Sequence, residues 1–84
     1  MFTARTDTGR NNYIGIAIRK QRKLLRISQR EVADRLVALG LVIDKNAVQR
    51  IESGQRFITD VELPYFSKLF NMTISELYEE SQDV

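Results

Sequence analysis

Residues 28–56 read SQREVADRLVALGLVIDKNAVQRIESGQR, and this stretch decides the fold. Ser28 followed by Glu31 is the pattern of a helix N-terminus, because the serine oxygen accepts from a free backbone N–H while the glutamate reaches back. Gly40 is placed to end that helix, since a residue without a Cβ enters the left-handed region at little cost. Asp44 supplies the next N-cap. The stretch therefore predicts two helices joined by a turn.

Apolar residues recur at helical spacing in both segments and predict one buried stripe on each helix. The first stripe consists of Val32, Ala33, Leu36 and Leu39. The second is narrower and consists of Ala47, Val48 and Ile51. It leaves one polar face on the second helix, formed by Lys45, Asn46, Gln49 and Arg50. Amide and cationic donors of this kind pair with base edges in a major groove, so this face is a candidate reading surface.

The flanking sequence predicts three more helices. From Tyr13 to Leu25 one helical stripe is formed by Ile14, Ala17, Ile18, Gln21 and Leu25. The capping pattern recurs at Thr59–Glu62 and at Thr73–Glu76. The two helices that follow are expected to bury Leu63, Phe66, Leu69, Phe70, Ile74 and Leu77. Pro64 lacks a backbone N–H and is expected to shift the start of the fourth helix.

We expect one compact all-α domain of five helices over residues 13–80. Residues 1–12 contain few large apolar side chains and predict a flexible N-terminal tail. The alternative is a basic arm in which Arg5 and Arg10 reach DNA phosphates or the minor groove. Residues 81–84 predict a frayed C-terminus.

The 84-residue chain contains no cysteine and no histidine. It therefore lacks thiol and imidazole metal ligands, disulfides and the usual nucleophile–base pairs. We expect no enzymatic activity, no cofactor, no metal and no separate small-molecule module. No apolar run reaches the roughly 18 residues that a membrane span requires, and the N-terminus lacks the apolar core of a signal peptide. A cytoplasmic protein without membrane contact is expected.

Charge is segregated along the chain. Residues 1–56 carry 12 Lys and Arg against 5 Asp and Glu, a net charge of +7. Residues 57–84 carry 1 against 6, a net charge of −5. The basic part coincides with the two-helix stretch, which favours a negatively charged partner such as nucleic acid.

The two-helix stretch resembles the helix-turn-helix core of the phage lambda repressor, Cro and Xre-type regulators. The likeness is carried by Ser28-Gln29, Val32-Ala33, Val48, Ile51-Glu52 and Gly54. It extends from about Ile14 to Leu77 and implies a lambda repressor-like five-helix fold. The compact form of the family has fewer residues before the second helix. The surplus lies between Val37 and Ile43, and predicts an extra helical turn plus a longer connection.

The resemblance also implies roles for single residues. In relatives, a glutamine at the position of Gln29 grips a DNA phosphate and braces the reading helix. An arginine–glutamate pair at the positions of Arg22 and Glu52 ties the first helix to the third. Arg26 stands where relatives often have glycine, so an uncommon backbone conformation is expected there. Further candidates for phosphate contacts are Ser28, Gln55 and Arg56.

The function implied is transcriptional control by binding double-stranded operator DNA, with repression the expected effect. The helix from about Lys45 to Ser53 would read bases. Relatives bind two-fold operators as dimers, so a homodimer formed through residues 70–78 is expected. The alternative is a protein-interaction module, for example an antitoxin, that retains the repressor-like fold. Its affinity would depend weakly on salt, whereas DNA binding depends on salt steeply.

Overall fold

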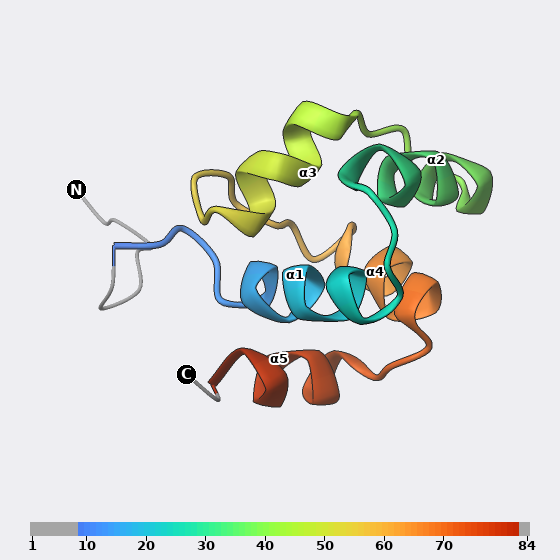
Figure 1. Ribbon diagram of the computed structural model, residues 1–84. Helices are drawn as coiled ribbons and strands as arrows, with labels where there is room; N and C mark the ends of the chain where they lie inside the picture. The colour runs from blue at the N-terminus through green and yellow to red at the C-terminus, as the bar shows by residue number, and fades with distance from the viewer. Residues whose placement is uncertain (1–8, 83–84) are drawn as a thin grey trace.

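The computed structural model describes residues 9–82, and five α-helices lie within them (Figure 1). They are α1 (Ile14–Leu24), α2 (Gln29–Leu39), α3 (Lys45–Glu52), α4 (Leu63–Phe70) and α5 (Ile74–Gln82). None of these described residues is in a β-strand. The predicted all-α, five-helix fold is therefore confirmed.

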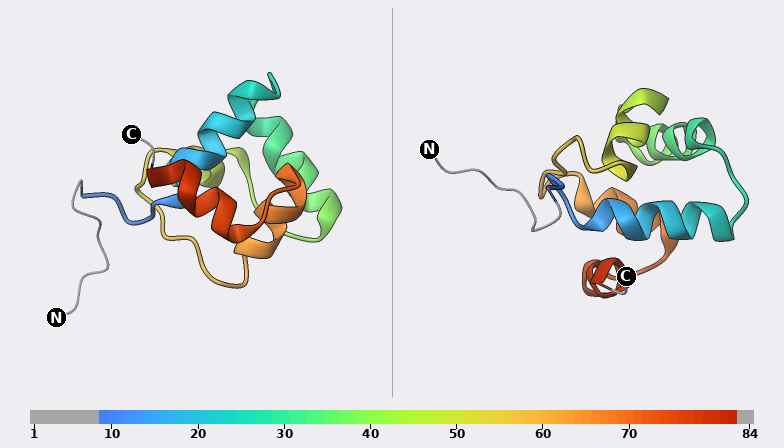
Figure 2. Two further views of the ribbon diagram at one scale, coloured as in Figure 1. Left: turned by 90° about the horizontal axis from the view of Figure 1, so that it is seen from below. Right: turned by 60° about the vertical axis from the view of Figure 1, so that its left-hand side comes forward.

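The helices are arranged around α1, which runs through the middle of the molecule (Figure 1). It packs against α3 on one side and against α5 on the other, while α2 packs against α3 and α4. The right-hand view of Figure 2 shows the same order, with α3 above α1 and α5 below it. Consequently α3 and α5 lie on opposite sides of α1.

The core lies where the inner faces of the five helices meet. Its fully or nearly fully buried members include Ala17, Ile18, Val32, Leu36, Val48, Ile51, Phe66 and Leu77. The predicted stripes of α2 and α3 are thus confirmed except at one position. Leu63 and Leu69 are partly buried and pack against this core. Burial of each large apolar side chain contributes about 1.5–3 kcal/mol relative to leaving it exposed.

Three side chains predicted to be buried are exposed. Leu25 is 48% exposed, Leu39 is 41% exposed and Ile74 is 41% exposed. Each stands at the end of an element: Leu25 follows the last residue of α1, Leu39 ends α2, and Ile74 begins α5. These positions fit the helical period, but neighbouring helices only partly cover the terminal turns in which these side chains lie.

The predicted capping residues begin their helices. The Ser28 hydroxyl accepts from the Glu31 N–H at 3.0 Å, and Asp44 Oδ1 accepts from the Ala47 N–H at 2.8 Å. Glu31 does not reach back to Ser28, because its carboxylate pairs with Arg35 at 2.6 Å. The third pattern forms the full reciprocal box, in which Thr73 and Glu76 each accept the other's backbone N–H.

Pro64 shifts the start of α4, as expected. The Glu62 carboxylate accepts from the Thr59 N–H at 3.0 Å, yet the helix begins only at Leu63. Left-handed residues then end the helices at the predicted places. Positive φ angles are found at Arg26 (57°), Gly40 (111°), Gly54 (84°) and Asn71 (54°). The uncommon conformation expected of Arg26 is therefore present, at the turn between α1 and α2.

The connection between α2 and α3 spans residues 40–44. The N–H groups of Gly40 and Leu41 donate to carbonyls in the last turn of α2. Ile43 is buried, whereas Val42 is 91% exposed. The longer connection is therefore anchored to the core, and its geometry is fixed by packing on both sides of Val42.

Both predicted chain ends need correction. The predicted flexible tail includes residues 10–12, but the structure holds these residues against the C-terminal end of α3 through hydrogen bonds. Residues 1–8, including Arg5, lie outside the described residues. The predicted frayed end also begins too early, because α5 reaches Gln82 and Ser81 is 1% exposed. The Ser81 hydroxyl donates to the Leu77 carbonyl and accepts from the Ala17 N–H.

Candidate nucleic-acid interface

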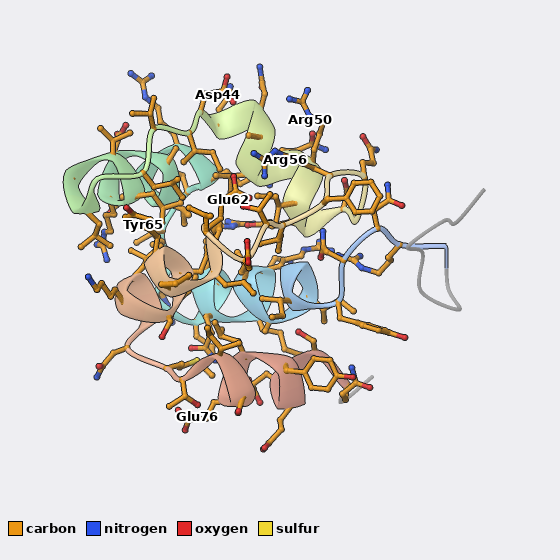
Figure 3. The ribbon with its side chains drawn as sticks, turned by 180° about the vertical axis from the view of Figure 1, so that it is seen from behind. Asp44, Arg50, Arg56, Glu62, Tyr65 and Glu76 are labelled. Atoms are coloured by element: carbon orange, nitrogen blue, oxygen red, sulfur yellow. The ribbon has the colours of Figure 1, made fainter. Side chains whose placement is uncertain are left out.

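The polar face predicted on α3 exists in the structure. Lys45, Asn46, Gln49 and Arg50 are all exposed. Spacings of one, three and four residues place them on one side of the helix, opposite the buried Val48 and Ile51. Figure 3 shows Arg50 pointing away from the body of the molecule. The donors of this face are therefore available to a partner.

Both ends of α3 are fixed by hydrogen bonds. Asp44 caps its first turn, where the free backbone N–H groups need an acceptor. At the other end, the N–H groups of Gln55 and Arg56 donate to the Arg50 carbonyl at 2.8 and 3.1 Å. The left-handed Gly54 permits this reversal of the chain. A helix of two turns would be marginal in isolation, so these caps and its buried stripe keep it folded.

Glu52 connects three helices beneath the exposed face. This residue is 5% exposed, and the Arg22 guanidinium donates to both of its carboxylate oxygens, at 2.7 and 3.0 Å. The third guanidinium nitrogen donates to the Ile27 carbonyl at 3.1 Å. The Gln29 amide donates to Glu52 Oε1 at 3.1 Å. The predicted ion pair is therefore present, and it joins α1, α2 and α3.

The predicted phosphate-contacting residues differ in availability. Ser28 and Gln55 are exposed. Gln29 is half-buried and gives one amide hydrogen to Glu52. Arg56 forms a bidentate pair with Glu62, at 2.8 and 3.1 Å, and also donates to the Phe57 carbonyl. Figure 3 shows Arg56 and Glu62 directed toward one another below α3.

The Arg56–Glu62 pair also shifts the pKa of both groups. The hydrogen bond from Arg56 holds the pKa of Glu62 below its ordinary value of 4.5, and the same bond raises the pKa of Arg56. The Arg56 side chain is 31% exposed and the Glu62 side chain only 12%. Arg56 thus braces the loop after α3 in this structure, which is a different role from the phosphate contact expected from the sequence.

Two shallow depressions flank α3. One, of about 260 Å³, lies between α1, α2 and α3 and is lined by Arg19, Arg22, Gln29, Gln49, Glu52 and Ser53. It brings the predicted base-reading Gln49 next to the predicted phosphate-contacting Gln29. Three of its residues are amide or hydroxyl groups and two are arginines. An anionic partner lying along α3 would therefore meet hydrogen-bond donors here.

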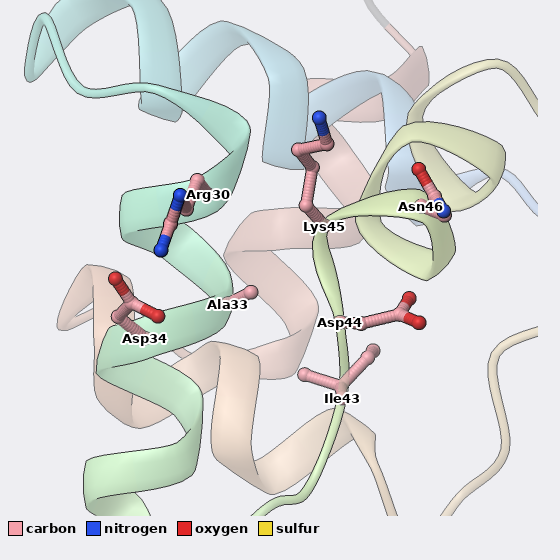
Figure 4. Close-up of a pocket in the computed structure, with 7 residues that line it drawn as sticks. All are labelled: Arg30, Ala33, Asp34, Ile43, Asp44, Lys45 and Asn46. Atoms are coloured by element: carbon pink, nitrogen blue, oxygen red, sulfur yellow. The ribbon is translucent and has the colours of Figure 1, made fainter.

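The second depression, of about 380 Å³, lies between the start of α2 and the start of α3 (Figure 4). Arg30 and Asp34 line it from α2, Lys45 and Asn46 line it from α3, and Asp44 lines it from the end of the connection before α3. The two cations are thus offset by two carboxylates at this end of the helix. The first depression, by contrast, is lined by two arginines, Arg19 and Arg22, and by one carboxylate, Glu52.

Arg19 and Arg30 were not among the predicted contact residues. Both are exposed and each lines one depression beside α3. A signal for Arg19 was present in the sequence, because it lies one turn before Arg22 on the same helix face. Once Arg22 is paired with Glu52, Arg19 must also lie near α3. Arg30 follows the Ser28 cap by two residues, and the sequence alone does not show which helix its side chain faces.

Among the residues that the structure describes, no group of Asp, Glu, His or Cys side chains is gathered as a metal site. No helix of residues 9–82 is both long and apolar enough to cross a membrane. Comparison of the sequence with models of known protein families gives no match, and comparison with curated proteins gives none either.

Proposed function

We propose that the protein is a sequence-specific regulator, a repressor of the lambda repressor-like, Xre-type class, that acts in the cytoplasm and reads double-stranded operator DNA with α3. The observation that carries this proposal is the α3 face. Four exposed donors lie on one side of a short helix whose other side is buried and whose two ends are capped. A rigid helix that presents donors outward suits the major groove, which admits an α-helix.

The chemistry of the face supports base reading. An arginine or lysine makes paired hydrogen bonds to guanine, and an asparagine or glutamine makes them to adenine, each worth about 1–3 kcal/mol of discrimination. Arg50 is the strongest candidate, because it is exposed and its side chain points away from the body of the molecule. Gln29, held by Glu52 beside Gln49, would orient its remaining amide hydrogen toward a phosphate.

The proposal is tested with a randomised duplex pool. Fluorescence anisotropy at several salt concentrations, followed by sequencing of the bound fraction, compares the wild type with Arg50→Ala. The matched control is Arg35→Ala, which removes the same charge from α2, where Arg35 pairs with Glu31 and lines neither depression beside α3. We expect a selected motif with the wild type and the control, and loss of the motif with Arg50→Ala.

The salt dependence separates the alternatives. DNA binding predicts that log affinity falls with log salt by roughly 0.9 for each phosphate neutralised. If the wild type shows no affinity better than about 10⁻⁴ M at low salt, weaker than ordinary non-specific association, the DNA proposal is wrong. The exposed face of α3 would then serve a protein partner, as in an antitoxin.

We further propose that the regulator works as a homodimer. One helix in the major groove covers few base pairs, and two-fold operators are read by two-fold dimers. Of the segment expected to form the contact, Phe70 and Leu77 are buried in the core, whereas Ile74 and Tyr78 are 41% and 48% exposed. Tyr78 also lies edge-to-face with Tyr13, at 6.0 Å between ring centroids. This exposed aromatic pair is the surface that supports the dimer.

A further inference from the structure

Residues 10–12 run alongside the C-terminal end of α3 and the loop that follows it. The backbone N–H of Asn11 donates to the Gly54 carbonyl at 2.8 Å, and its side-chain amide donates to the Gln55 carbonyl at 2.8 Å. The Arg10 guanidinium donates to the Glu52 carbonyl at 2.9 Å. These partners are more than 40 residues away in sequence. We call residues 10–12 the clasp.

Asn12 links α1 to α3 through a single side chain. Its Oδ1 accepts from the Gly15 N–H at 2.7 Å, in the first turn of α1. Its Nδ2 donates to the Ile51 carbonyl at 3.0 Å and to the Arg56 carbonyl at 2.7 Å. Only an amide supplies one acceptor and two donors in this arrangement, and the reversed amide would satisfy none of the three contacts. Neither aspartate nor serine reproduces it.

Two glycines leave the space that the clasp occupies. A Cβ on Gly15 would overlap the Ile51 carbonyl oxygen and would lie 2.5 Å from Asn12 Oδ1. A Cβ on Gly54 would lie 2.8 Å from Arg10 Cγ, and the φ of Gly54 is +84°. The close approach of α1 to the end of α3 therefore requires Gly15, and the position of the Arg10 side chain requires Gly54. The clasp thus connects the start of α1, the end of α3 and the loop after α3.

The clasp also supplies hydrogen-bond donors to the partly negative C-terminal end of α3. The last carbonyls of a helix carry partial negative charge and lack partners within the helix. Arg10 and Asn12 satisfy the carbonyls of Ile51 and Glu52 at this end. Burial lowers the pKa of Arg10, because the guanidinium is partly removed from water. These contacts are made one and two residues after Arg50, in the last turn of α3.

We propose that the clasp fixes the direction in which α3 is presented, and that Asn12 is a positioning residue for base reading. The effect on base reading rests on the proposed DNA-binding function. The holding of α3 rests only on the contacts of Asn12. Asn12 does not touch bases. It acts by holding the C-terminal end of α3 against α1, so that Gln49 and Arg50 meet the groove in one orientation rather than several.

The test uses variants that separate the two halves of the Asn12 amide. Asn12→Asp and Asn12→Ser both keep an oxygen that can accept from Gly15. The aspartate has no donor for the Ile51 and Arg56 carbonyls, and the shorter serine has one hydroxyl hydrogen in place of two amide hydrogens. Asn12→Ser adds no charge. The matched control is Asn71→Asp, which makes the same substitution at an exposed left-handed residue after α4, a conformation that aspartate also adopts. Circular dichroism and thermal unfolding establish that each variant is folded.

The first measurement is amide hydrogen exchange without DNA. We expect the N–H groups of Gln55 and Arg56 to exchange about tenfold faster in both Asn12 variants, the effect of losing one or two hydrogen bonds. The amide of Ile18, at the centre of α1, should keep its wild-type rate. Faster exchange throughout the chain would show general destabilisation and would overturn the positioning role, as would unchanged exchange at Gln55 and Arg56.

The second measurement is the ratio of affinities for the selected duplex and for a scrambled duplex. We expect this ratio to fall by about tenfold in the Asn12 variants, while affinity for the scrambled duplex stays within about twofold of wild type. An unchanged ratio would overturn the positioning of base reading. Failure of the wild type to bind any duplex would overturn the proposed function instead, and the exchange measurement would still decide whether the clasp holds α3.

Discussion

At the scale of single residues, Glu52 links three helices, because this residue of α3 accepts hydrogen bonds from α1 and α2. Its carboxylate is almost fully buried and is satisfied by Arg22 and Gln29. A buried carboxylate without its cation is costly, because the charge has lost its water. This accounts for a buried acidic residue in the predominantly basic part of the chain, directly beneath the face that would meet DNA.

Arg22→Ala is therefore expected to reduce the free energy of unfolding by about 3–5 kcal/mol, since it leaves the Glu52 carboxylate buried and unpaired by a cation. The measurement is urea denaturation followed by circular dichroism. Arg35→Ala serves as the control, because it breaks the Arg35–Glu31 pair, whose side chains are 45% and 46% exposed. An exposed pair of this kind contributes about 0–1 kcal/mol. Equal losses for the two variants would contradict the role of burial.

The Arg56–Glu62 pair makes stability depend on pH. The hydrogen bond from Arg56 holds the folded pKa of Glu62 below 4.5. The stabilisation is therefore present above the unfolded pKa and is lost as the pH falls through the folded pKa. Glu62→Gln removes this titration, so its melting temperature should fall less than that of wild type between about pH 5 and about pH 3. Parallel pH curves for the two proteins would show that the pair does not contribute.

At the same scale, the sequence predicted the partner of Arg22 but not the partner of Arg56. The Arg22–Glu52 pair was found by resemblance, and the structure confirms it. Arg56 was expected at a phosphate but is paired with Glu62. A cationic side chain beside a reading helix serves equally well as a phosphate contact or as a structural brace. The choice depends on whether a carboxylate from another turn of the chain lies within reach.

At the scale of elements, α3 depends on its caps because it is short. Asp44→Ala is expected to lower the free energy of unfolding by about 1 kcal/mol, since the Ala47 N–H loses its acceptor. Thermal or urea unfolding measures this loss. Asp44→Asn is the control, because asparagine caps as well as aspartate but removes the charge. If both variants lose the same stability, the charge of Asp44 rather than its hydrogen bond supports α3.

The helices were predictable and the clasp was not, for a physical reason. Helix starts at Ser28, Asp44 and Thr73 depend on contacts three residues apart, which a sequence displays directly. The clasp depends on carbonyls 39 to 44 residues away in the chain. Its own composition, with an arginine and two asparagines, is also typical of a mobile tail. The glycine at position 15 was the remaining signal, because glycine inside a predicted helix costs about 1 kcal/mol relative to alanine unless close packing requires it.

At the scale of the whole molecule, the segregated charge of the sequence becomes a separation in space. The exposed face of α3 lies on one side of α1, and α5, with its carboxylates, lies on the other (Figures 1 and 3). Arg50 and Glu76 are found at opposite ends of the view in Figure 3. An anionic partner is thus attracted to one side and repelled from the other, which would orient its approach.

This arrangement restricts the proposed dimer. A contact through the α5 surface farthest from α3 would turn the two reading helices away from each other. We therefore propose that the contact lies at the edge where Tyr78 meets Tyr13. Tyr78→Ala is therefore expected to abolish two-chain complexes on the selected duplex, as measured by sedimentation velocity, without unfolding the domain. Phe57→Ala is the control, because Phe57 is 52% exposed, comparable with Tyr78, but lies in the loop after α3.

Complexes of two chains that persist in Tyr78→Ala would place the contact elsewhere. One chain per duplex in the wild type would remove the dimer while leaving the α3 face, on the other side of α1, free to read DNA alone.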